Sequence, residues 1–373
     1  MPYDLLATQR VNTIMREVRD ARELPQNLLL LNRTPITDAT DGEMTAYWDG
    51  NTSPADIIAD GQRALVYSTG AFSLKSDKIP NIKAGEGIDA EMLQLMERIQ
   101  AGGGFRDDTG VINAYMTRVM ERRLRAVRMT MEIMRIGAFL DSLTWNRGGV
   151  QFSISFNKPS DLKVTVSNYW TDATNGTPIA DIQTHMAHRR EQYGENTTRL
   201  TMTSADFRYM IATTEFRNKA TLYAQMVLPS AASFPIQDIG TMQNLAGRIL
   251  GLTIELHDAK YAFQNADGST GAFGNYWPAG YVGFSDAASD NDPNATDFGN
   301  TTVTESIVAG LTGTNFAGAG GTGGFGGPVK GPVGYVTLSS FDLNAPGVTA
   351  WGVARTMPRV FRRTAESYLK VQA

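Results

Sequence analysis

Residues Val111–Leu140 read V-I-N-A-Y-M-T-R-V-M-E-R-R-L-R-A-V-R-M-T-M-E-I-M-R-I-G-A-F-L, and this stretch decides the fold. Apolar residues recur in it every three or four positions, which is typical of one face of a helix; they are Ile112, Met116, Met120, Leu124, Val127, Met131, Met134 and Ala138. No proline interrupts the run. We therefore expect one helix of roughly 45 Å, about three times the mean helix length, with the rest of the chain arranged around it.

The opposite face of this predicted helix is basic. It carries Arg118, Arg122, Arg123, Arg125, Arg128 and Arg135, against Glu121 and Glu132. In the simplest hypothesis the helix packs on a core and its arginines are solvated. A coiled coil is a second hypothesis, but the spacing lasts only about four heptads and no matching helix occurs elsewhere. In the third, the helix is the spine of a subunit that tiles into a shell, and the arginines face neighbouring copies or a polyanion.

Composition excludes several classes of protein. The chain of 373 residues can form two packed regions, and its lack of cysteine excludes disulfides and thiol chemistry. No run approaches 18 apolar residues, so no membrane span is expected. The first ten residues lack the basic flank of a secretory signal. Neither G-x-S-x-G nor H-E-x-x-H occurs, so we expect no catalytic site, no cofactor and no metal.

Charge is distributed unevenly along the chain. No lysine or arginine lies between Lys260 and Lys330, whereas this interval holds Asp267, Asp286, Asp290, Asp292, Asp297 and Glu305. The residues from Arg355 to the end are basic, with five cations and one glutamate. We expect one acidic and one basic end, an asymmetry suited to head-to-tail packing of identical copies.

The chain before the long helix reads as an arm followed by a hairpin. Residues 1–35 include a short amphipathic helix and an apolar tetrad between two prolines, which either enters a core or anchors on a neighbouring subunit: Leu28, Leu29, Leu30 and Leu31. Alternation over residues 43–74 predicts two strands around a long loop, and such a hairpin needs a surface to lie on. A short helix is expected from Ile88 to Ile99, and Asp108 or Thr109 is expected to cap the long helix.

The chain after the long helix reads as strands and then a mixed α/β region. Residues 151–156 and 161–166 alternate, which predicts that they pair as a hairpin. A helix is expected from Pro178 to residue 194; its His185 and His188 have a spacing that could hold a metal, but two solvated side chains are the simpler interpretation. Short strands and helices then alternate to residue 256, with Ser204 as a helix cap. A hairpin over 261–284 and closing strands near the C-terminus follow.

The glycine-rich run 318–327 does not predict a phosphate site. A P-loop requires G-K-[ST] at the start of a helix, whereas Lys330 is followed by Gly331 and Pro332. We interpret the run as a surface loop.

The order of these elements resembles the lambda-type major capsid protein E family of tailed double-stranded-DNA phages, whose members have the α+β Hong Kong 97 fold. Several stretches carry the resemblance. They are P-N-I-K-A-G-E-G-I-D-A-E-M-L at 80–93, the arginine- and glutamate-rich helix followed by I-G-A-F-L-D, N-Y-W-T-D-A-T-N-G-T-P-I-A-D-I at 168–182, and Y-W-P-A-G-Y-V-G-F at 276–284. Each motif is weak alone, and their order across nearly the whole chain makes the resemblance specific.

The resemblance implies a division into the domains of that fold. Residues 1–35 would form the N-terminal arm and 36–87 an extended E-loop that lies across a neighbouring subunit. The P domain would comprise 88–177, with the spine helix at 111–140, and a C-terminal return at 345–373. Residues 178–344 would form the A domain around the axis of each capsomer. The extra length of segment 286–331 has no counterpart in the core of the fold.

The resemblance also implies a function. The chain would be a structural protein of the virion. In the host cytoplasm its copies would assemble as the pentamers and hexamers of an icosahedral shell, which encloses double-stranded DNA. Its partners would be further copies, a separate scaffolding protein, a portal and a decoration protein. The expected contacts between copies are Leu28–Leu31, Tyr47 and Trp48 in the arm and E-loop, and acidic Asp56 and Asp60 against Arg118, Arg122, Arg125 and Arg128. The alternatives are another phage structural protein such as a tail-tube subunit, or an enzyme or glycan-binding module.

Overall fold

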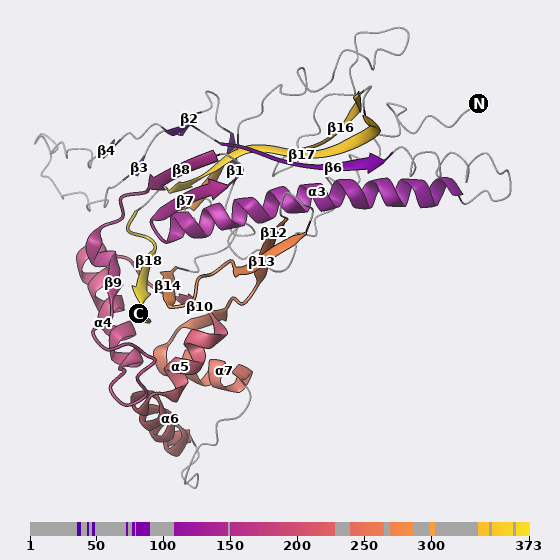
Figure 1. The fold of residues 1–373 in the computed structure, drawn as a ribbon. Coiled ribbons are helices and arrows are strands. Elements are labelled where there is room, and N and C mark those ends of the chain that lie inside the picture. The colour runs from indigo at the N-terminus through magenta and orange to yellow at the C-terminus, as the bar shows by residue number, and fades with distance from the viewer. Residues whose placement is uncertain are drawn as a thin grey trace, which may run out of the picture. The chain divides into compact units, whose positions relative to one another are not determined.

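The computed structural model describes part of the chain, and the structural statements below concern that part. The described residues are 36–38, 43–44, 47–48, 72–73, 77–78, 80–89, 108–147, 150–227, 239–264, 269–286, 298–302, 335–342, 345–360 and 363–373. The chain divides into two compact units. Unit 1 comprises residues 1–44, 76–134 and 300–359, and unit 2 comprises 45–75, 135–299 and 360–373. Each unit is considered by itself (Figure 1).

The predicted spine helix is confirmed as α3, Asp108–Phe139, with 32 residues. The helix begins at Asp108, so Asp108 and Thr109 lie in its first turn and not at the cap. The side chains of the predicted apolar face that the structure describes are buried: Val127 and Ala138 are fully covered, Met131 is 1% exposed and Met134 is 2% exposed. The helix ends where Asp141 adopts a left-handed backbone, with φ of 66°.

Unit 1 contains a five-stranded sheet. Four strands are in the order β1 (Ile36–Asp38), β15 (Phe298–Thr302), β17 (Ala345–Val360) and β16 (Tyr335–Asp342), and β6 (Asn81–Asp89) also pairs with β17. Strands β6 and β17 are antiparallel over nine consecutive residue pairs. In Figure 1 both strands run alongside α3.

Strand β6 corrects the prediction for the segment before the spine helix. The helix expected from Ile88 to Ile99 cannot begin at Ile88, because Ile88 and Asp89 pair with Val348 and Gly347 of β17. Residues 90–99 lie outside the described residues. Glycines weaken an isolated strand, but here the long β17 supplies a hydrogen-bonding partner from about 260 residues away in sequence, which no local pattern reveals.

The extended hairpin expected over 43–74 is confirmed where β3 (Tyr47–Trp48) pairs with β4 (Phe72–Ser73). A second antiparallel pair, of β2 (Glu43–Met44) with β5 (Asp77–Lys78), extends it beyond residue 74. Both pairs therefore join the same two stretches of chain.

The hairpin expected between 151–156 and 161–166 is wrong in its pairing. Strand β8 (Val150–Ser155) pairs instead with the preceding β7 (Ser142–Arg147), in register from Ser142–Ser155 to Arg147–Val150. The second predicted strand exists as β9 (Lys163–Thr165), after a short 3₁₀ helix η2 (Ser160–Leu162), and joins another sheet. The connection between β7 and β8 is shorter than the one between the two predicted strands, so closing it costs less entropy. No strand was predicted at 142–147.

Unit 2 is built on a five-stranded mixed sheet. Its order is β11 (Thr253–Leu256), β10 (Arg199–Met202), β14 (Tyr281–Ser285), β18 (Ser367–Lys370) and β9. Its helices are α4 (Pro178–Tyr193), α5 (Ser204–Ala212), α6 (Thr214–Val227) and α7 (Ile239–Leu250). The predicted helix beginning at Pro178 is confirmed. The cap of α5 is Thr203 and not Ser204, because the Thr203 hydroxyl accepts the backbone N–H of Asp206 at 3.1 Å.

One continuous apolar core holds this unit together. It joins residues of the sheet, such as Leu200 and Phe284, to residues of the helices, such as Phe207 and Ile182, all fully buried. The last turn of α3 enters the same unit through Phe139, whose ring meets that of Trp277 edge-on at 5.1 Å. Only glycine fits at position 283 of β14, because a β-carbon there would lie 2.6 Å from Trp277 and 2.7 Å from Phe139.

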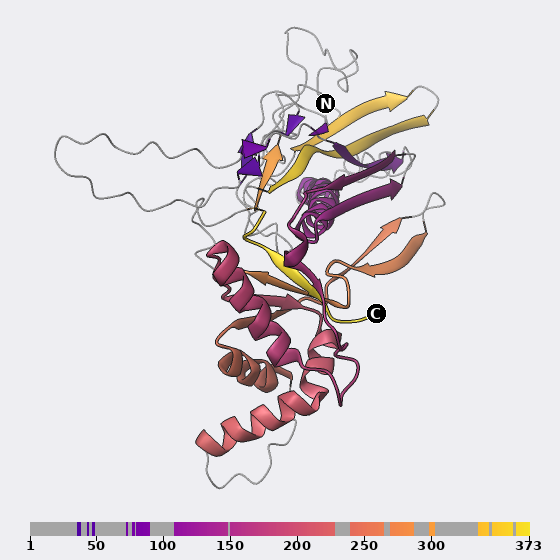
Figure 2. The same ribbon diagram turned by 90° about the vertical axis from the view of Figure 1, so that its left-hand side faces the viewer.

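A second ribbon in unit 2 stands apart from the sheet (Figure 2). Strands β12 (Lys260–Gln264) and β13 (Thr270–Asn275) pair only with each other among the described strands. The hairpin predicted over 261–284 is thus confirmed in its first part, whereas residues 281–285 belong to the main sheet. One face of the ribbon carries Phe263, whose ring meets Trp145 of β7 at 5.6 Å. Phe273 is 72% exposed.

Candidate assembly surface

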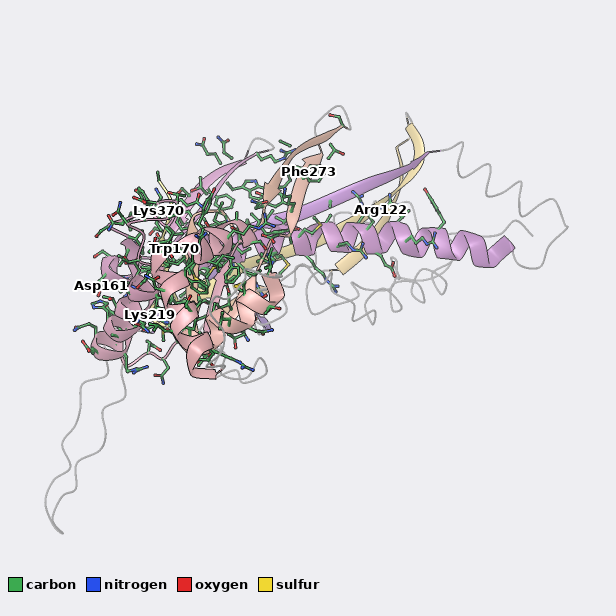
Figure 3. The ribbon with its side chains drawn as sticks, turned by 90° about the horizontal axis from the view of Figure 1, so that it is seen from below. Arg122, Asp161, Trp170, Lys219, Phe273 and Lys370 are labelled. Atoms are coloured by element: carbon green, nitrogen blue, oxygen red, sulfur yellow. The ribbon has the colours of Figure 1, made fainter. Side chains whose placement is uncertain are left out.

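The first part of α3 presents a row of exposed arginines. Arg118, Arg122 and Arg125 are exposed, and their spacing of four and then three residues places them on one side of the helix. Figure 3 shows Arg122 on this helix. We call these three residues the α3 arginine row. Their positive charges lie close together on a rigid element, which suits them to bind a partner with several negative charges.

The second part of the helix does not continue this row. Arg128 is 6% exposed and Arg135 is fully buried, so the prediction that both lie on the outer face is wrong. Burial lowers the pKa of Arg128, and its Nε atom has no hydrogen-bond partner within the described part of the chain. Glu132 is also fully buried. The charged pattern of the sequence runs the length of the helix, but burial ends its exposed part near Arg125.

The structure describes only part of the remaining predicted contacts. Tyr47 and Trp48 form β3, whose backbone pairs with Ser73 and Phe72. The tetrad Leu28–Leu31 and the acidic Asp56 and Asp60 lie outside the described residues. The expected contacts of Tyr47, Trp48, the tetrad and the acids with a second copy stay predictions.

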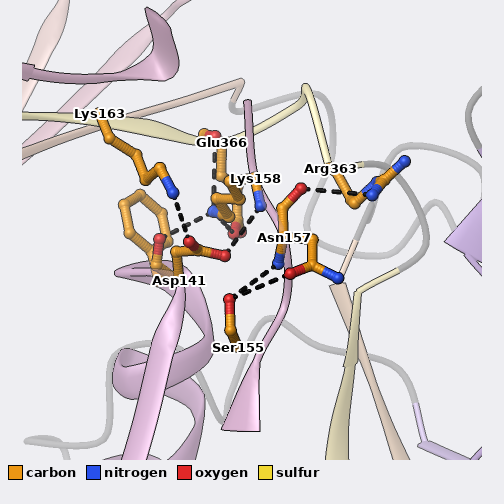
Figure 4. A network of polar contacts seen from close by, with 8 residues as sticks. Asp141, Ser155, Asn157, Lys158, Lys163, Arg363 and Glu366 are labelled. Atoms are coloured by element: carbon orange, nitrogen blue, oxygen red, sulfur yellow. Dashed lines mark hydrogen bonds and ion pairs between the residues drawn. The ribbon is translucent and has the colours of Figure 1, made fainter. Parts of the chain in front are cut away.

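A buried lysine anchors the end of α3 to the C-terminal segment (Figure 4). The Lys158 ammonium donates to the carbonyl of Phe139 at 2.7 Å and lies 3.3 Å from a carboxylate oxygen of Glu366. Burial lowers the pKa of Lys158, and the charge of Glu366 acts against that shift.

Asp141 completes this network at the end of the helix. Its carboxylate accepts the backbone N–H of Lys158 at 2.8 Å and the ammonium of Lys163 at 2.7 Å. The network ties residues 139–163 to residue 366, and a positive charge near the helix C-terminus is favourable. This network was not predicted. Lys158, which lies just after the alternating residues 151–156, was the one local feature that could have pointed to it.

The two histidines of α4 make separate hydrogen bonds. The ring Nε2 of His185 lies 2.8 Å from the Ser367 hydroxyl, and that of His188 lies 2.9 Å from the Asp161 carboxylate, which also accepts the Tyr193 hydroxyl. Burial lowers the pKa of His185 to about 4, and the positive charge of Arg189 adds to the effect. Among the described residues no three histidine, aspartate or glutamate side chains are placed to hold a metal ion.

Two further predictions concern the glycine-rich run and membrane spans. The glycine-rich run 318–327 lies outside the described residues. In the part of the chain that the structure describes, no helix is long and apolar enough to cross a membrane.

Two solved structures resemble this chain over almost its whole length. A prophage protein of Escherichia coli CFT073, described as a capsid protein, has a TM-score of 0.58 at 13% identity, with 98% of this chain and 99% of that chain covered. A phage-related protein of Bordetella bronchiseptica RB50 has a TM-score of 0.54 at 11% identity, with 96% of each chain covered. At such identities the likeness concerns the fold, which is the mixed α+β, Hong Kong 97-like fold of capsid proteins.

The sequence itself identifies the family. The family model described as phage major capsid protein E matches residues 26–288, more than half of the chain. This chain belongs to the phage major capsid protein E family. No curated protein matches its sequence.

The chain is therefore a phage major capsid protein, a structural component of the virion that assembles into an icosahedral shell. The predictions of the family, of the fold and of a structural rather than an enzymatic role are confirmed. Membership of this family favours the capsid prediction over a tail-tube subunit and over an enzyme or glycan-binding module.

Proposed function

We propose that the α3 arginine row forms a contact between copies in the shell, in which it binds the acidic segment within the E-loop of a neighbouring copy. The observation that carries this proposal is the exposure of Arg118, Arg122 and Arg125 along one side of a 32-residue helix. The segment between β3 and β4 contains three aspartates, Asp49, Asp56 and Asp60. Opposite charges on rigid and extended elements fix the register of two subunits more than they add affinity.

Arg128 is a weaker candidate for this contact. Its side chain is 6% exposed, so a carboxylate of a neighbour reaches it only if the side chain moves. We therefore limit the proposed contact to the exposed row and keep the arm tetrad Leu28–Leu31, with Tyr47 and Trp48, as its apolar complement. An apolar centre surrounded by charged pairs is the usual anatomy of a stable interface.

The domain assignment and the remaining partners belong to the same proposal. Residues 1–35 act as the arm, 36–87 as the E-loop, 88–177 with 345–373 as the P domain and 178–344 as the A domain. Copies associate as pentamers and hexamers, assisted by a separate scaffolding protein, a portal and a decoration protein, around double-stranded DNA bound without sequence preference. What supports this is the family of the chain, the long helix α3 and the pairing of β3 with β4.

Charge reversal on the row tests the proposal. We expect the double variant Arg122→Glu, Arg125→Glu to stop particle formation, seen by negative-stain electron microscopy and sedimentation, while the monomer keeps its circular dichroism and melting temperature. The matched control is Arg190→Glu, Lys260→Glu, which makes the same change in charge at two exposed positions on α4 and β12. Normal particles from the first variant would refute the contact.

The packaged DNA is the alternative partner of the row. Binding to DNA depends steeply on salt and is indifferent to sequence. If the row faces DNA, the reversed variant should form normal empty shells that package less DNA. Shells that fail to form at all indicate the contact between copies.

A further inference from the structure

A second basic surface lies on the outer sides of three helices of unit 2. Helices α5, α6 and α7 pack in succession and lie together at one end of that unit (Figures 1 and 2). Their exposed side chains include four cations and two large apolar groups. We call this set the helical basic surface: Arg208, Tyr209, Arg217, Lys219, Leu222 and Arg248. Figure 3 labels Lys219 on α6.

The cations of this surface outnumber the acids that lie beside them in the described part of the chain. The only acidic residues of the described parts of α5, α6 and α7 are Asp206 and Glu215. Asp206 is fully buried, and its carboxylate accepts the backbone N–H of Gly280. The Glu215 carboxylate accepts the backbone N–H groups of Ile179 and Ala180 at the start of α4, at 2.8 and 3.1 Å. Both carboxylates are thus engaged inside the unit. The exposed Asp258 lies at the start of α5, where its carboxylate accepts the backbone N–H of Ser204 at 2.8 Å. The four cations therefore face one exposed acid that is itself hydrogen-bonded to the helix start.

The apolar side chains on this surface point to a protein partner. Leu222 is 60% exposed and Tyr209 is 40% exposed in the single chain, although α6 buries Phe216 and Ala220 on its other side. Phosphate groups would satisfy the cations but would give a leucine no apolar surface to pack on. Aromatic and arginine side chains together are typical of the centre of protein interfaces.

The chain itself supplies a segment of complementary charge. Four aspartates lie within residues 286–297, which read D-A-A-S-D-N-D-P-N-A-T-D, and the segment contains no lysine or arginine. Every copy in a shell therefore offers both a cationic helical surface and an anionic segment. Such a pair of unlike surfaces gives a heterologous contact, which closes into a ring when the rotation between copies is right.

We propose that the helical basic surface of one copy binds segment 286–297 of a neighbouring copy in the shell. The proposal rests on the assembly of identical copies described above, and it does not require the contact proposed for the α3 arginine row. The four cations select and orient the acidic segment, and Leu222 and Tyr209 pack on its alanine and proline side chains.

The absence of cysteine in the chain allows a direct test. One protein carries Leu222→Cys and a second carries Ser289→Cys. Mixing the two full-length proteins with a bismaleimide reagent should yield a covalent dimer that neither protein forms to the same extent alone. The matched control pairs Gln192→Cys, exposed on α4, with Ser289→Cys, and its dimer yield should be several-fold lower.

Charge swapping then examines the cause of the contact. Adding Arg217→Glu and Lys219→Glu to the Leu222→Cys protein should reduce the cross-link to the control yield, and adding Asp290→Lys and Asp292→Lys to its partner should restore it. A yield equal to the control from the start, or one indifferent to these charges, overturns the proposal. So does loss of double-stranded DNA binding in the Arg217→Glu, Lys219→Glu protein without any cross-link, because that result assigns the surface to DNA.

The same assay separates this proposal from the one for α3. The cross-link is measured again in the Arg122→Glu, Arg125→Glu background, where circular dichroism verifies that the monomer is folded. A cross-link that persists there, in a variant that forms normal particles, refutes the α3 contact and retains this one. A missing cross-link in the unmodified background refutes this one alone.

Discussion

The five-stranded sheet of unit 2 and the two-stranded hairpins are stabilised in different ways. The sheet encloses its own core, in which Trp170, Trp277 and Phe284 are each at most 1% exposed. The ribbon β12–β13 meets Trp145 of β7 through Phe263 and leaves Phe273 72% exposed. An isolated two-stranded hairpin is marginally stable in water. The sheet is therefore stabilised by its own core, whereas the hairpins depend on the elements that pack against them.

The two kinds of element also differ in how the chain forms them. The hairpins β7–β8 and β12–β13 join neighbouring stretches. The sheet brings together β9, β10 and β18, so the last residues of the chain close a core begun some 200 residues earlier. The long-range contacts of the sheet must form together, and we expect one cooperative transition for it.

A matched pair of phenylalanine substitutions gives the largest expected contrast. Phe284→Ala empties a fully buried position of β14 and should lower the free energy of unfolding by roughly 3–5 kcal/mol. Phe273→Ala removes the same side chain from an exposed position and should change it by less than about 0.5 kcal/mol. Urea denaturation followed by fluorescence measures both. Equal effects would show that the ribbon belongs to the cooperative core.

The sequence predicts the fold well where the pattern is local. The length of α3 and the start of α4 at Pro178 follow from periodicity and a proline at the first helical position. Pairing between distant segments could not be predicted from the same information. The helical prediction at Ile88 fails because the partner of β6, strand β17, lies far along the chain. The predicted pairing of 161–166 fails because β9 pairs with the distant β18.

Protonation of His185 makes the free energy of unfolding of this unit depend on pH. Its ring packs 4.7 Å from that of Phe284, and burial lowers its pKa to about 4 from the ordinary value of 6.5. Between pH 6.5 and about pH 4, His185 binds a proton in the unfolded chain but stays neutral in the folded chain. Stability is therefore complete above about pH 6.5 and falls as the pH drops toward 4, by about 3 kcal/mol in all.

The variant His185→Gln isolates this contribution. It should lose less stability than the unmodified chain between pH 7 and pH 5, as measured by urea denaturation at each pH. Asp206, whose pKa is raised by burial, acts in the opposite direction and is present in both proteins, so it cancels in the difference. Identical pH profiles would mean that His185 accepts a proton without cost, contrary to its burial.

The candidate surfaces were predictable only in part. The arginines of α3 could be found from sequence, but which of them are exposed depends on packing that covers Arg128 and Arg135. The helical basic surface does not follow from the prediction of α5 and α6 as helices, because it depends on which of their residues face outward. Buried Phe216 and Ala220 flank Lys219, and this helical spacing was the available signal.

The last prediction concerns a local effect, at the contact between the two hairpins. Trp145 of β7 meets Phe263 of β12 edge-on, and the guanidinium of Arg147 lies 4.4 Å from the same ring. Trp145→Leu keeps an apolar side chain but loses the aromatic pair, worth about 1 kcal/mol. Because the ribbon has few other supports, the loss should appear as faster amide hydrogen exchange in residues 260–264, with little change in the global unfolding midpoint. Thr144→Ala, exposed on the other face of β7, is the matched control and should leave that exchange unchanged. A global shift as large as that of Phe284→Ala would instead make the two hairpins part of the core, and the distinction between sheet and ribbon would fail.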